Sequence, residues 1–345
     1  MKKKDIGFYL LLLVLHLSCA NEDIVRIKIG EPKLVINGIL SPEQEIAIHL
    51  SKSFGSGSKL SDAELKELAI VRVYINDQFS GVMIPEDKEP EAENDIEEKG
   101  NYRLAGVKPL ARDEIRIEAE VEGYPIAVVT TRIPDSPVLL TVDTVRYLDA
   151  KTEERMRLYV KMEDAKEQRN YYRILLSKGV TKNGMKEREQ FPLSYSFYYY
   201  YPYSYGYGGY DDDFWFINYE DPAFTADLPI QTMGAARINE YGIFSDNLFN
   251  GNEYVLKLSF TNPINSIKSD SLDLQIKYNV KLVSVSESYY HYYKRSSSLS
   301  LSVGNIQLTP LRDNYMSYSN VINGLGLVFS CNETKYEIEM PDGTS

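Results

Sequence analysis

Apolar and polar residues alternate in short segments along most of the chain. The segments 45–51, 70–75 and 114–121 each place isoleucine, leucine, valine or alanine at every second position. A period of two residues is typical of a β-strand with one buried face. Turn-forming sequences such as Asn37-Gly38 and Gly123-Tyr124-Pro125 separate these segments. The pattern predicts an all-β protein built from antiparallel sandwiches, and long helical segments between strands, typical of a doubly wound sheet, are absent from it.

The segment Ile133-Pro134-Asp135-Ser136-Pro137 is predicted to separate two domains, because prolines this close together cannot lie in a central strand. We therefore expect two immunoglobulin-like β-sandwich domains. The N-terminal domain would cover residues 33–134, and a β-rich C-terminal domain would cover residues 135–345.

One short helix is expected near residues 285–296. Ser284 and Glu287 have the spacing of a capping box, with Ser284 as the N-cap. After this helix, the segment 319–329 ends in an apolar strand that is approached through two glycines.

A tyrosine-rich segment at about 190–220 interrupts the second domain, and it reads as a biased insertion rather than a core strand. Tyrosine offers a large contact area and a hydroxyl group at a low cost in conformational entropy, so the segment is a candidate site for a glycan, a peptide or a protein. Two alternatives stay open: its rings could pack onto their own domain, or the segment could be disordered. The candidate binding residues are Tyr195, Tyr198, Tyr199, Tyr200, Tyr201, Tyr203, Tyr205, Tyr207, Tyr210 and Trp215.

The N-terminus has the layout of an export signal, with basic residues 2–4, an apolar run at 6–17 and the sequence Leu17-Ser18-Cys19. The apolar run is shorter than the roughly 20 residues that a spanning helix needs. A cysteine after Leu-Ser resembles a bacterial lipobox, although His16 departs from it. This predicts a signal peptide over residues 1–18, lipid attachment at Cys19 and an acylated tether over 19–32. An ordinary secreted protein is the alternative.

Charge and residue types limit the chemistry that the chain can perform. The formal net charge is −12, which argues against binding to nucleic acid or through a polybasic membrane patch. Beyond the signal only two histidines remain, His49 and His291, too few for a histidine-based zinc site. Cys331 reads as a small buried hydrophobic residue rather than a nucleophile. The run Asp211-Asp212-Asp213 could bind Ca²⁺, but it lacks the spacing of an EF-hand and a solvated turn is favoured.

These features predict a protein that is not an enzyme and that holds no metal or cofactor. Nucleophile-elbow, Walker and dinucleotide motifs are absent from the sequence. A paired-carboxylate glycosidase stays open, because carboxylates are abundant and their separation cannot be read from a sequence.

Several ordered stretches of the sequence resemble a known family. Besides the lipobox, they are Pro32–Gly38, Leu50–Ser53, Gly123-Tyr124, Asn170-Tyr171-Tyr172, Phe244–Gly251, Ser286–Tyr290 and Ser319–Gly326. In this order they resemble the Bacteroidetes outer-membrane lipoproteins grouped as domain of unknown function 4249. The tyrosine-rich segment has no counterpart in that resemblance.

The resemblance implies a lipid-anchored protein of the outer membrane, without established catalytic residues. Such lipoproteins often accompany TonB-dependent transporters, and acidic residues after the cysteine resemble a surface-export signal. We therefore expect a surface-exposed, non-catalytic binding accessory of a TonB-dependent nutrient transporter. The first alternative is a structural or adhesive surface lipoprotein that binds host glycan or matrix. A glycoside or peptide hydrolase is the second.

Overall fold

The structure is a computed structural model, and it describes the greater part of the chain between residues 31 and 339. The described residues are 31–54, 65, 69–86, 101–149, 154–166, 168–182, 185–186, 193–194, 216–226, 239, 241–261, 274–299 and 318–339. Cys19, the tyrosines from 195 to 210, Asp211-Asp212-Asp213 and Trp215 lie outside this part of the chain.

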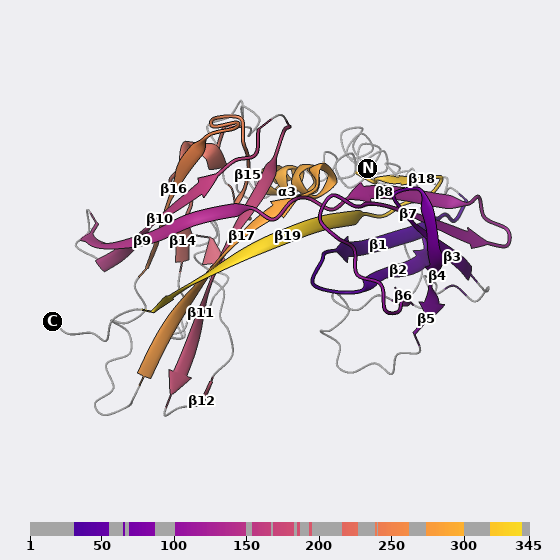
Figure 1. Cartoon of the computed structure of the whole chain (residues 1–345), viewed down its shortest axis with the longest axis horizontal. Coiled ribbons are helices and arrows are strands. Elements are labelled where there is room, and N and C mark those ends of the chain that lie inside the picture. Colours follow the sequence, from indigo (N-terminus) through magenta and orange to yellow (C-terminus); the bar gives the residue numbers. More distant parts are fainter. Residues whose placement is uncertain are drawn as a thin grey trace, which may run out of the picture.

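The described chain is mostly β-strand, which confirms the all-β prediction (Figure 1). The strands form three sheets, and helix α3 (Glu287–Leu299) is the one α-helix among the described residues. A short 3-10 helix covers Pro222–Phe224.

The largest sheet extends through both halves of the molecule (Figure 1). In spatial order its strands are β12 (Met185–Lys186), β11 (Tyr171–Lys182), β17 (Leu274–Val285), β19 (Val328–Glu339), β1 (Leu34–Leu40), β2 (Ile46–Lys52), β6 (Tyr102–Leu104) and β5 (Ile84–Pro85), with β15 (Ile243–Ser245) paired to β11.

Each of the other two sheets packs on one half of the large sheet. The sheet on the N-terminal half contains β18 (Val321–Ile322), β8 (Ala127–Arg132), β7 (Glu114–Val121), β3 (Ala69–Ile75) and β4 (Gln78–Val82). The sheet on the C-terminal half contains β13 (Leu193–Ser194), β14 (Phe216–Asn218), β16 (Glu253–Thr261), β10 (Glu154–Glu163) and β9 (Val138–Leu148).

The alternation in the sequence explains the two main cores. Ile46, Ile48 and Leu50 of β2 are buried against Ile115 and Ile117 of β7, while the intervening side chains of both strands are less buried. In the second half, β10 and β16 face β11 and β17 in the same way. The division into domains 33–134 and 135–345 stays a prediction, but residues from the C-terminal segment, Val321 and Val328, pack in the first core.

Strand β19 joins the two halves of the large sheet. Its first residues pair in parallel with β1, from Gly38↔Val328 to Leu40↔Ser330, and the rest of the strand pairs antiparallel with β17. The chain approaches β19 through Gly326, whose φ of +104° places it against the carbonyl oxygen of Ile36. A Cβ atom at this position would collide with that oxygen, so the close approach requires glycine.

A third core lies under helix α3. Tyr289 and Tyr290 of the helix pack with Tyr171 and Phe329, which belong to β11 and β19. The predicted helix exists, but the predicted cap was two residues early, because β17 continues through Ser284 to Val285. The N-cap is Ser286, whose Oγ accepts a hydrogen bond from the backbone N–H of Tyr289 at 3.4 Å.

Candidate functional site

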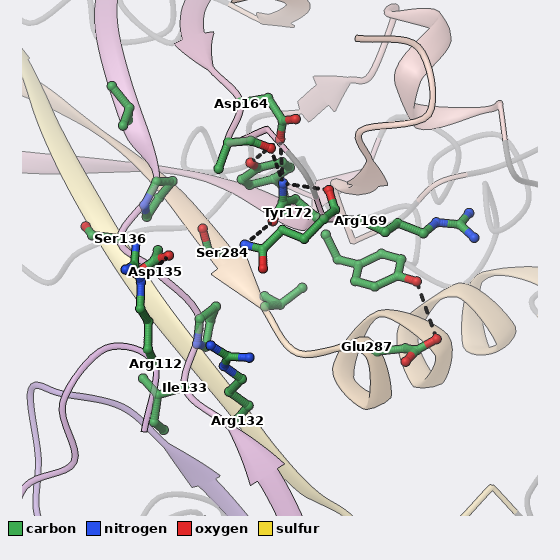
Figure 2. A pocket seen from close by; sticks show the side chains of 18 of the residues that line it. Arg112, Arg132, Ile133, Asp135, Ser136, Asp164, Arg169, Tyr172, Ser284 and Glu287 are labelled. Carbon is green, nitrogen blue, oxygen red and sulfur yellow. Dashed lines mark hydrogen bonds and ion pairs between the residues drawn. The ribbon is translucent and has the colours of Figure 1, made fainter. Parts of the chain in front are cut away.

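A cavity of about 500 Å³ lies where the two halves of the molecule meet. Its walls come from the linker between β8 and β9, the loop between β10 and β11, the end of β17 and the first residue of α3. Figure 2 shows Arg132 and Asp135 on the N-terminal and linker side, with Asp164 and Glu287 across from them. The volume is in the range of small-molecule sites, which makes this cavity the candidate functional site.

The linker is held against β19 by side chains rather than by a backbone ladder. Proline has no N–H to donate, so this segment cannot form a regular strand pair with β19. Instead, three β19 side chains donate hydrogen bonds to linker carbonyl oxygens: Ser330 to Arg132 at 2.5 Å, Asn332 to Pro134 at 3.1 Å, and Thr334 to Pro137 at 2.7 Å. One wall of the cavity is thereby fixed to the strand that spans both halves.

Asp164 organises the opposite wall. It is buried, and its carboxylate accepts hydrogen bonds from the hydroxyl of Tyr172 at 2.5 Å, the side-chain amide of Asn170 at 3.1 Å and the backbone N–H of Gly251 at 2.7 Å. Burial, together with this hydrogen bond, raises the pKa of Tyr172 far above its ordinary value. These contacts tie the loop before β11 to the turn before β16.

A second buried carboxylate, Asp246, lies behind this wall. Its Oδ2 accepts the backbone N–H of Asn170 at 2.7 Å, and its own backbone N–H donates to the carbonyl oxygen of Asn170 at 3.1 Å. Burial raises the pKa of Asp246, and the nearby charge of Asp164 raises it further. Its Oδ1 is buried without a hydrogen-bond partner among the described residues.

Three arginines contribute positive charge to the cavity. Arg112 adopts a left-handed conformation, with φ of 72°, and its Nε lies 2.8 Å from Asp135 Oδ1. Arg132 is exposed at the end of β8. Arg169 lies over the ring of Tyr171, with 5.6 Å from its guanidinium carbon to the ring centre.

The start of α3 closes the cavity beside Tyr171. The hydroxyl of Tyr171 donates to Glu287 Oε1 at 3.4 Å, and the ring stacks on Tyr290 with 4.5 Å between centres. His291 Nε2 is also 3.4 Å from Glu287 Oε1. Burial raises the pKa of Tyr171, and the charge of Glu287 adds to this effect.

The residues that the sequence singled out for chemistry do not meet in this cavity. His49 is exposed on β2, and Cys331 is partly buried next to the core under α3, where burial raises its pKa to about 11. The described residues contain no group of three or more histidine, cysteine or acidic side chains arranged to hold a metal ion. Within the same part of the chain, no helix is long and apolar enough to cross a membrane.

A family model covers most of the chain. Residues 22–337 match the model of Domain of unknown function (DUF4249). The chain belongs to the DUF4249 family. No curated protein matches it.

The matched DUF4249 region includes every residue that lines the cavity. Sequence reasoning missed Asp164, Tyr172 and Asp246 as site residues. The sequence points to this region in part, because Asn170-Tyr171-Tyr172 and Phe244–Gly251 are two of the stretches that carry the family resemblance. Nothing in either stretch indicates that the two pack together.

Proposed function

We propose that this DUF4249 protein is a surface-exposed outer-membrane lipoprotein that acts as a non-catalytic binding accessory of a TonB-dependent nutrient transporter. The cavity between the two halves is the observation that carries the binding role. It is lined by charged and polar side chains from both halves and has the size of a small-molecule site.

The hydrogen bonds and the ion pair of the carboxylates Asp164 and Asp135 favour a binding role over acid–base catalysis. Asp164 uses both oxygens as acceptors of structural hydrogen bonds, and Asp135 is paired with Arg112. A general acid or base must exchange a proton with its substrate, whereas these groups hold the walls in place. A preformed wall lowers the ordering cost of ligand binding.

The sequence supports the location, and family analogy supports the partner. The segment from Lys2 to Cys19 has the layout of a lipoprotein signal, and Asn21, Glu22 and Asp23 resemble a surface-export signal. The transporter partner rests on family analogy, since lipoproteins of this kind often accompany TonB-dependent barrels.

The test is a mild-detergent pull-down of the lipidated protein from its native membrane, with mass spectrometry of the proteins that accompany it. A stoichiometric TonB-dependent barrel is the expected result. A Cys19→Ala variant, which cannot be lipidated, is the control for contacts that need the membrane anchor. Recovery without a barrel, with surface labelling still positive, would refute the transporter role and favour an adhesive protein that binds host glycan or matrix.

A second experiment addresses the tyrosine-rich segment as a binding element. Deleting residues 195–210, which leaves strand β13 (Leu193–Ser194) intact, should leave the melting temperature unchanged and weaken partner or ligand binding. A large fall in melting temperature would instead mean that these rings pack onto their own domain.

A further inference from the structure

The start of β1, which follows the predicted tether, lies at the end of the N-terminal half that is remote from the cavity. Strand β19 runs from this half into the other one, and β1 pairs in parallel with its first residues (Figure 1). Strand β8 gives the same direction, because its last residue, Arg132, lines the cavity while its first residue, Ala127, lies at the other end.

Several turns meet at this remote end. The backbone N–H of Leu325 donates to the carbonyl oxygen of Leu34 at 2.8 Å, and the side-chain amide of Asn323 donates to the carbonyl oxygen of Ile126 at 3.3 Å. The last residues of β2 also lie here, because β2 pairs antiparallel with the start of β1. We call this set of residues the tether end: 31–35, 52–54, 122–126 and 322–325.

Large apolar side chains are exposed at the tether end. Four of them, each at a strand end or in a turn, expose between 37% and 65% of their surface: Phe54, Ile126, Ile322 and Leu325. Single exposed apolar residues are common on protein surfaces. The group at the tether end therefore has to be compared with the other end of the same half.

The opposite end of the N-terminal half, next to the cavity, is acidic instead. Its loops are residues 41–45, 76–77 and 105–113. They hold four acidic and two basic residues, namely Glu43, Glu45, Asp77 and Asp113 against Lys108 and Arg112. Only one large apolar side chain in these loops, Leu110, is exposed.

The tether end carries no formal net charge. Its two acidic residues, Glu31 and Glu122, are balanced by Lys33 and Lys52. In a chain with a formal net charge of −12, a neutral surface with several exposed apolar side chains is suited to contact with lipid rather than water.

The position of the predicted anchor indicates which surface covers this end. Cys19 and Leu34 are 15 positions apart. A chain extends by at most about 3.3–3.6 Å per residue, so the tether end stays within roughly 50 Å of the bilayer that holds the lipid. The lipid surface is thus always within reach of these apolar side chains.

We propose that the tether end docks on the bilayer and that its four exposed apolar side chains enter the region between headgroups and acyl chains. The proposal rests on the lipid anchor proposed above, and it adds a second membrane contact and an orientation. Strand β1, 7 residues long, separates the two ends of the N-terminal half by about 20 Å, so docking turns the acidic end and the cavity away from the membrane.

The first experiment is co-sedimentation of the complete mature chain with phosphatidylcholine vesicles, which carry no net charge. A Cys19→Ser variant, exported with the signal peptide of an ordinary secreted protein, removes the lipid so that binding reports the tether end alone. Ile322→Asp should weaken this binding about tenfold or more, because the transfer of an isoleucine side chain out of water contributes at least that factor.

Leu110→Asp is the matched control for charge and exposure. It adds the same charge at the opposite end, at a leucine that is 69% exposed where Ile322 is 65% exposed. Vesicle binding should be unchanged in this variant. Equal weakening by both substitutions, or no weakening by Ile322→Asp, would overturn the docking surface.

The second experiment measures membrane depth in the lipidated chain, and it decides the case in which the unlipidated chain binds too weakly to sediment. A spin label is attached in Ile322→Cys or in Leu110→Cys, each combined with Cys331→Ser, and the protein is reconstituted in the same vesicles. Oxygen should reach the label at position 322 more readily than a water-soluble nickel complex does, and the reverse should hold at position 110.

Three results of the depth measurement would overturn the proposal. Labels that are equally open to the nickel complex would mean that the chain hangs free on its anchor. Shielding of position 322 in native outer membranes but not in pure lipid would mean that a protein, such as a barrel, covers the tether end. Spin–spin broadening between labels at position 322 would identify a second copy of the chain as the cover.

Mass spectrometry of residue 19 separates this inference from the proposed function. An acylated Cys19 combined with a tether end open to water would reject the docking and leave the lipoprotein standing. An unmodified Cys19 combined with vesicle binding that Ile322→Asp weakens would reject the lipid anchor and keep the docking surface.

Discussion

Replacing Asp164 with alanine tests whether its carboxylate holds the cavity wall. The change would leave the buried hydroxyl of Tyr172 and the partly buried N–H of Gly251 without their acceptor. The side chain of Asn170 would keep its bonds to the carbonyl oxygens of Ala165 at 3.0 Å and Gln168 at 3.3 Å, so it adds little to the loss.

The expected cost follows from these two orphaned donors. Each buried donor that loses its partner costs about 1–3 kcal/mol, so Asp164→Ala should lower the free energy of unfolding by about 2–6 kcal/mol. Removing the carboxylate also relieves its repulsion with Asp246, which places the expected value in the lower half of that range. A domain of ordinary stability, about 5–15 kcal/mol, would still fold.

Urea-induced unfolding, followed by circular dichroism, measures this loss. Glu163→Ala is the control, because Glu163 is the preceding residue but is exposed, and it should change stability by about 0.5 kcal/mol or less. A double-mutant cycle with Tyr172→Phe isolates the bond between the two side chains. If Asp164→Ala costs no more than Glu163→Ala, or if the cycle shows no coupling, the wall is not organised by this carboxylate.

Three further changes test other features of the fold. Folding raises the pKa of Asp246 above its ordinary value of 3.8, so the folded chain holds the Asp246 proton to higher pH than the unfolded chain does. The free energy of unfolding of the wild type should therefore fall relative to that of Asp246→Asn as pH rises from 3.8 through the folded-state pKa. A difference between the two proteins that stays constant with pH would contradict this. Gly326→Ala should lower the melting temperature more than Gly123→Ala, because both glycines have positive φ but only Gly326 faces a backbone oxygen where the Cβ would lie; equal losses would refute the steric argument. Arg173→Lys should cost about 1.5–3 kcal/mol in urea unfolding, since lysine cannot reproduce the forked donation to Tyr289 and to a backbone carbonyl; an unchanged unfolding midpoint would argue against it.

Local patterns predicted the strands and the fold class. The alternation in 45–51 and 114–121 correctly indicates which side chains are buried, because burial of one strand face is a local property with a period of two residues. The helix after β17 was also predicted, but its cap was misplaced, because β17 pairs with β11 as far as Ser284 and with β19 as far as Val285.

The cavity could not be predicted, because the residues that form it come together only through long-range pairing. Asp164 and Asp246 are 2 of the chain's 50 acidic residues, and their burial, which Asp221 shares among the described residues, cannot be read from the sequence. The tyrosine-rich segment, the strongest candidate from composition, lies outside the described residues and stays a prediction.

The way β19 is shared between the two halves has a consequence for folding. Asn37 accepts a hydrogen bond from Leu327, a residue 290 positions away, and β1 has β19 as its parallel neighbour. During synthesis, β1 and β2 therefore leave the ribosome long before the strand that completes their side of the sheet. Until β19 is synthesised, the edge of β1 that pairs with it stays open. We therefore expect this chain to fold slowly and to depend on chaperones.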